Sequence, residues 1–93
     1  MAVDPITLAL LAAPVVRLVF ERVLKNRSIR FGDLIKQVEQ VDPNVDRRQA
    51  KATLDQLQNA HLIKEKGSAL EDFNTYYVTA DGLEASRKAG IRS

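Results

Sequence analysis

A cluster of side chains suited to binding phosphates and base edges begins at residue 47. Within five successive positions the chain carries Arg47, Arg48, Gln49 and Lys51. Arginine and lysine neutralise phosphate charge, and arginine, lysine and glutamine can hydrogen-bond to base edges. This spacing indicates contact with a nucleic acid. The alternative is an ordinary solvated helical face, because charged residues are mostly exposed and Asp55 follows Lys51 by four positions.

Further polar side chains precede this cluster and are candidates for contacts to phosphates: Lys36, Gln37, Arg27 and Arg30. The charge distribution supports this placement. Residues 17–51 hold nine Lys or Arg against five Asp or Glu, whereas residues 52–93 hold five against six. We therefore expect an anionic partner to contact the first two-thirds of the chain.

Length and composition favour one small domain over residues 1–93, with residues 14–89 as its body. The chain has no cysteine and a single histidine, His61, so a thiolate or histidine metal site is not expected. No glycine-rich phosphate loop or nucleophile-and-base pair is visible, which argues against an enzyme. The sequence also predicts no cofactor. The apolar run at 6–16 is too short to span a bilayer and lacks a basic start, so we expect a soluble, cytoplasmic protein.

The basic cluster must lie at the start of a helix. Asp46 can cap a helix over residues 46–60 by accepting a bond from a backbone N–H. Helical periodicity then divides the helix into two sides. The side expected to face the core comprises Ala50, Thr53, Leu54 and Leu57. The opposite side comprises Arg48, Ala52, Asp55 and Asn59, with Arg47 and Lys51 flanking it.

Other helices are predicted before this one. Asp4 and Pro5 are typical of a helix start, and Pro14 should interrupt that helix and begin a second one reaching Lys25. Residues 28–30 can form a short edge strand. The next helix, 31–41, has a buried stripe and ends before Pro43. That stripe comprises Phe31, Leu34, Ile35 and Val38.

The sequence from His61 onward predicts a β-hairpin and a last helix. His61 stands where a helix commonly ends with positive φ, and a strand should run over residues 62–66. The loop 67–74 is longer than a minimal hairpin turn, which indicates a mobile tip. In the returning strand, Tyr76 should face the core and Tyr77 should be half-exposed. Thr79 can cap a helix that reaches Lys88.

Three segments resemble the winged helix-turn-helix proteins of bacteria and archaea, with the MarR, PadR and HxlR families as the nearest shapes: Ile29-Arg30-Phe31-Gly32-Asp33-Leu34, Leu54-x-x-Leu57 leading into Leu62-Ile63, and Tyr76-x-Val78-Thr79-x-x-Gly82. The resemblance covers about residues 14–88. It implies a mostly α-helical protein with a small β-hairpin, in the α+β class. It also implies a homodimeric transcriptional regulator that inserts helix 46–60 into the major groove of double-stranded DNA.

Two parts of the chain depart from this pattern or leave alternatives open. Where such proteins usually have a glycine after the recognition helix, this chain has Ala60-His61. The hairpin tip, or wing, carries Glu71 and Asp72, which repel phosphate. Either the wing points away from DNA, or the domain binds a protein partner and has no DNA affinity of its own.

Apolar residues at the wing and near the N-terminus are candidates for contacts with another protein or with a second copy of the chain. Leu70 and Phe73 could anchor a protein partner at the wing, although we favour their folding back onto the hairpin. The apolar residues 6–13 could form a homodimer contact. Alternatively, they cover the C-terminal helix of their own chain next to Leu83.

Overall fold

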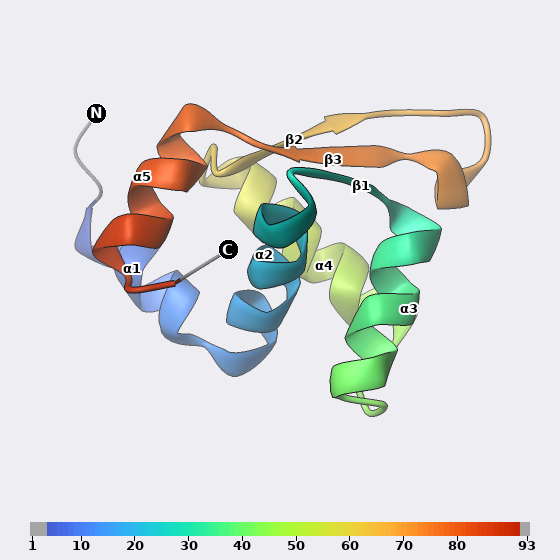
Figure 1. Ribbon diagram of the computed structural model, residues 1–93, viewed down its shortest axis with the longest axis horizontal. Helices are drawn as coiled ribbons and strands as arrows, with labels where there is room; N and C mark the ends of the chain where they lie inside the picture. The colour runs from blue at the N-terminus through green and yellow to red at the C-terminus, as the bar shows by residue number, and fades with distance from the viewer. Residues whose placement is uncertain (1–3, 92–93) are drawn as a thin grey trace.

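The computed structural model describes residues 4–91. Its helices are α1 (Pro5–Ala12), α2 (Pro14–Asn26), α3 (Phe31–Val41), α4 (Arg47–Asn59) and α5 (Ala80–Lys88). Its strands are β1 (Ser28–Arg30), β2 (Ile63–Lys66) and β3 (Thr75–Val78), and a short 3₁₀ helix, η1 (Glu71–Phe73), precedes β3. In Figure 1 the strands run along the top of the molecule with α2, α3 and α4 beneath them. The predicted α+β class is confirmed at this level.

The sheet has the strand order β1-β3-β2, with both neighbouring pairs antiparallel. Its register aligns Ile29 with Tyr76 and Tyr76 with Glu65. Because side chains alternate along a strand, these three residues share the face that covers the helices. The predicted edge strand at 28–30 and the predicted hairpin are both present.

Side-chain caps and prolines set the helix boundaries. Asp4 accepts a bond from the Thr7 backbone N–H at 2.7 Å, Asp46 from Gln49 at 2.7 Å, and Thr79 from Gly82 at 2.9 Å. The hydrogen bond from Thr7 also holds the pKa of Asp4 below its ordinary value. Pro14 separates α1 from α2, as predicted. His61 has a φ of 63°, the left-handed conformation expected at that position.

The core lies between the sheet and the helices. The predicted stripes of α3 and α4 are all buried, and Tyr76 has no exposed surface, whereas Tyr77 is 37% exposed. Arg48, Ala52 and Asp55 lie on the exposed side of α4. Burial of one side of α4 therefore fixes the direction of its polar side, as the periodicity predicts.

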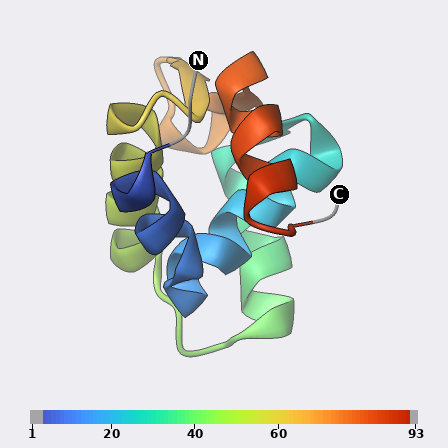
Figure 2. The same cartoon turned by 90° about the vertical axis from the view of Figure 1, so that its left-hand side faces the viewer.

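Helix α1 packs against α2 and α5 within its own chain, and Figure 2 shows α1 and α5 on the same side of the molecule. Leu11 is buried there, but Ile6 remains 81% exposed. The apolar stretch is thus covered on one side by its own chain, and homodimerisation stays a prediction. No helix within residues 4–91 is long and apolar enough to cross a membrane.

Candidate nucleic-acid interface

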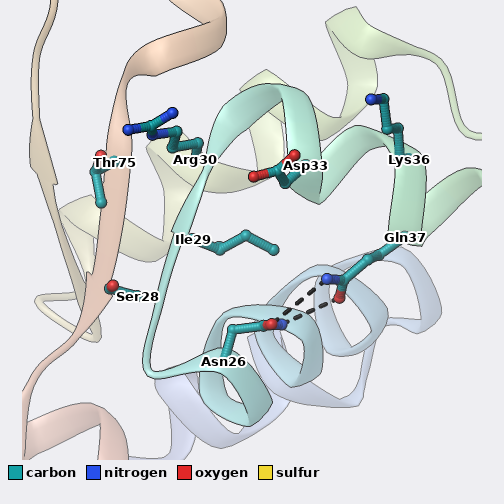
Figure 3. Close-up of a pocket in the computed structure, with 8 residues that line it drawn as sticks. All are labelled: Asn26, Ser28, Ile29, Arg30, Asp33, Lys36, Gln37 and Thr75. Atoms are coloured by element: carbon teal, nitrogen blue, oxygen red, sulfur yellow. Dashed lines mark hydrogen bonds between the residues drawn. The ribbon is translucent and has the colours of Figure 1, made fainter.

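Six of the eight candidate residues line two separate hollows. Arg47, Arg48 and Lys51 line an open hollow of about 330 Å³ on α4. A second hollow, of about 510 Å³, lies beside β1 and is lined by Arg30, Lys36 and Gln37 among others (Figure 3). The remaining two candidates lie outside both hollows: Gln49, which is exposed on α4, and Arg27, which caps the C-terminus of α2 with a φ of 65°.

Arg47 is held by the wing. Its Nη2 atom lies 3.0 Å from Glu71 Oε1 and 2.6 Å from Asp72 Oδ1. Its guanidinium also stacks on the Phe31 ring, 4.9 Å from the centroid. The hydrogen bond to Asp72, and to a lesser extent the one to Glu71, raises the pKa of Arg47. A phosphate would therefore have to compete with two carboxylates for this group.

Lys51 is also committed to its own chain. Its Nζ atom lies 3.1 Å from Glu65 Oε2, 3.0 Å from Tyr76 Oη and 3.6 Å from Asp55 Oδ1. Burial opposes the charge on Lys51, but the hydrogen bonds to Tyr76 and Glu65 outweigh it and raise the Lys51 pKa. Burial likewise opposes the charge on Glu65, and the bonds from Lys51 and Gln58 lower its pKa. Lys51 therefore connects α4 to the sheet.

Arg48 differs from its two neighbours. It is exposed, and no carboxylate within residues 4–91 forms an ion pair with it. The other two cations of this α4 face, Arg47 and Lys51, form ion pairs with four carboxylates, namely Asp55, Glu65, Glu71 and Asp72. The three basic residues of the predicted face are thus outnumbered by four carboxylates of the same chain.

The hollow beside β1 is polar but does not gather its charged groups at one point. Figure 3 shows Gln37 turned toward Asn26, and the two amides hydrogen-bond at 3.0 and 3.4 Å. Lys36 extends away from that pair, and the carboxylate of Asp33 lies between Lys36 and Arg30. The predicted backbone contact through Gln37 would require its amide to leave Asn26.

The wing does not lie where we expected. Leu70 and Phe73 were expected to fold back onto the hairpin, but η1 packs against α3, where a Cβ atom added at Gly32 would lie 3.4 Å from Asp72 Cβ. Leu70 is 60% exposed. Phe73 is 48% exposed and stacks under Arg30 at 5.2 Å. The attraction of Arg47 for Glu71 and Asp72 gives the physical reason, because it draws the tip toward the N-termini of α3 and α4.

Sequence reasoning missed two sets of residues. The first is the set of carboxylates that form ion pairs with Arg47 and Lys51. The second is Lys64 and Lys66, which lie on β2 with no ion-pair partner within the part of the chain that the structure describes. Because side chains alternate between the two faces along a strand, the strand predicted over residues 62–66 could have indicated that both lysines lie on one face of the sheet.

Comparisons with protein-family models, with curated proteins and with solved structures found no match to this chain.

Proposed function

We propose that this protein is a winged helix-turn-helix protein that binds double-stranded DNA through the outer face of α4, as a small cytoplasmic transcriptional regulator. The observation that carries the proposal is that α4 buries its apolar side while its outer side, including Arg48, stays exposed. The element order from α2 to β3 supports it, because a second helix entering the major groove is the usual mode of this motif.

Binding on this face would be an exchange of partners. Arg47 is half exposed, so DNA can reach it, but Glu71 and Asp72 must give up the guanidinium to a phosphate. Exposed ion pairs contribute little to stability and weaken with salt, which makes such an exchange feasible. DNA affinity should therefore be modest and limited by the wing.

The test is a fluorescence-anisotropy titration with a generic labelled duplex at about 50 mM salt, where nonspecific phosphate contacts are strong. Arg48→Gln should weaken binding and reduce the salt slope by about 1. Glu71→Gln with Asp72→Asn should strengthen binding about tenfold, because Arg47 is released and two repelling charges are removed.

A matched control removes two carboxylates elsewhere, at Glu21 and Asp81. If this control strengthens binding as much as the wing variant does, the effect is one of net charge and Arg47 is not masked by the wing. If Arg48→Gln leaves duplex affinity and its salt slope unchanged, the assignment of α4 is wrong.

A second candidate is a winged-helix module that binds a protein and has no intrinsic DNA affinity. The four carboxylates beside the cations of α4 and the exposure of Leu70 and Phe73 at the wing favour it. Absence of duplex binding at 50 mM salt, by both the native protein and the wing variant, would support this candidate instead.

Homodimerisation through residues 6–13 belongs to the same proposal, because the apolar side chain of Ile6 is exposed and lies outside the core of its own chain. Sedimentation velocity of the native protein and Ile6→Gln checks it. We expect the native protein to sediment as a dimer and Ile6→Gln to sediment as a monomer. A native protein that is monomeric at all concentrations would contradict homodimerisation.

A further inference from the structure

The face of the sheet that points away from the helices is basic. Side chains alternate along strands, so the register defines the six positions of this outer sheet face. They form two rows across the strands, Ser28–Tyr77–Lys64 and Arg30–Thr75–Lys66. Figure 3 shows Arg30 beside Thr75, on the side of β1 away from Ile29. In Figure 1, α2, α3 and α4 lie beneath the three strands, and none of these helices lies on the opposite side of the sheet.

The charge of this face is not offset by carboxylates as that of α4 is. None of its six positions is acidic. Lys64 and Lys66 are exposed and have no ion pair within residues 4–91. Arg30 stacks on Phe73 and shares a hollow with Asp33 and Asp72, so it contributes less. The two lysines are therefore cations that an external anion can reach without displacing a residue.

An aromatic ring lies beside these lysines. Tyr77 stands opposite Lys64 in the register and is 37% exposed, while Tyr76 points into the core. An exposed ring next to cations suits a single-stranded nucleic acid, because an unstacked base can lie on the ring while its phosphates meet the cations. A duplex cannot offer a base face in this way.

The dimensions of the outer sheet face also fit a single strand. Lys64 and Lys66 are two residues apart, so their Cα atoms are about 7 Å apart along β2. β1 lies two strand spacings from β2, about 10 Å. A short stretch of one strand can therefore contact both lysines and Tyr77 together.

We propose that the outer sheet face is a second nucleic-acid site, which binds a single strand through Lys64 and Lys66 with one base stacked on Tyr77. It lies on different elements from the α4 face and does not depend on duplex binding there.

The test is an anisotropy titration with a labelled oligonucleotide of about twelve thymidines at about 50 mM salt. Lys64→Gln with Lys66→Gln should lower affinity about tenfold. Tyr77→Leu should lower it at least about fivefold, whereas Tyr77→Phe, which keeps the ring, should bind nearly as the native protein does. Urea unfolding of each variant shows that the sheet still forms.

Two controls separate this site from α4 and from net charge. Lys25→Gln with Lys88→Gln removes the same charge from helices and should change affinity less than twofold, as should Arg48→Gln. Equal losses in either control, or equal affinity of Tyr77→Leu and native protein, would overturn the proposal. Full competition by unlabelled duplex at equal nucleotide concentration would do so too, because the face would then recognise phosphates alone.

Tyrosine fluorescence gives an independent readout. The chain has two tyrosines and no tryptophan, and Tyr76 is buried, so emission that changes on binding reports Tyr77. Stacking should quench this emission in the native protein and not in Tyr77→Phe. Binding without quenching in the native protein would contradict the stacking.

Discussion

The α4 face and the outer sheet face both carry three cations, but α4 leaves one of them without an intramolecular partner among the described residues and the sheet leaves two. On α4, Arg47 and Lys51 are held by carboxylates from the wing and from β2, and Arg48 alone has no such partner among the described residues. On the sheet, Lys64 and Lys66 face solvent with no acid in either row. The difference shows that the position of a basic residue and its availability to an anion are separate properties.

The largest expected effect breaks the scaffold that holds both faces. A Cβ atom added at Gly82 would lie 2.2 Å from the Leu62 carbonyl oxygen and 2.9 Å from Val78 Cγ2. Gly82→Ala should therefore destabilise the protein by about 3 kcal/mol, because α5 must move off the sheet. Urea unfolding measures this. Gly67→Ala, where nothing lies within 4 Å, is the control and should have little effect. Similar stabilities of the two variants would contradict the packing described.

A smaller effect separates the lysines of the two faces. Lys51→Met removes the donor to the buried Tyr76 hydroxyl and a partner of Glu65, and should cost about 1 to 2 kcal/mol. Lys64→Met on the outer sheet face should change the free energy of unfolding by less than about 0.5 kcal/mol. Thermal or urea unfolding of both variants makes the comparison. Equal costs would mean that Lys51 is no more tied to the fold than an exposed lysine.

The smallest effect concerns pH. The folded pKa of Glu65 lies below its ordinary value of 4.5, so its contribution to stability is complete above about pH 4.5 and is lost as pH falls through the lowered pKa. Glu65→Gln should therefore reduce the stability difference between pH 7 and pH 3, by at most about 1 kcal/mol because the pair is partly exposed. Lys66→Gln, on the outer sheet face, should not. An unchanged pH profile in Glu65→Gln would contradict the Lys51–Glu65 pair.

Most of the fold could be predicted from the sequence because its signals are local. Asp4, Asp46 and Thr79 each cap the helix predicted for them, and Pro14 divides the N-terminal helices. The buried stripe of α4 follows from a period that needs no knowledge of distant residues. The wing was less predictable: the mobility expected from its loop length stays a prediction, and no local signal revealed the 3₁₀ helix that packs on α3.

The candidate site was less predictable because its electrostatics are non-local. Glu71 and Asp72 follow Arg47 by 24 and 25 residues, and Glu65 follows Lys51 by 14. No local pattern in a loop reveals which helix it will contact. The outer sheet face similarly requires the register of three strands, two of which are separated from the third by two helices.

Chemical-shift mapping of the ¹⁵N-labelled protein, titrated separately with a duplex and with oligothymidine at the same salt, tests most directly whether the two faces are distinct. We expect the duplex to shift the amides of Arg48, Gln49 and Ala52, and the single strand to shift those of Lys64, Lys66 and Tyr77. Perturbation of one common set of residues by both ligands would show that the molecule has a single anionic surface and that the division drawn between α4 and the sheet is wrong.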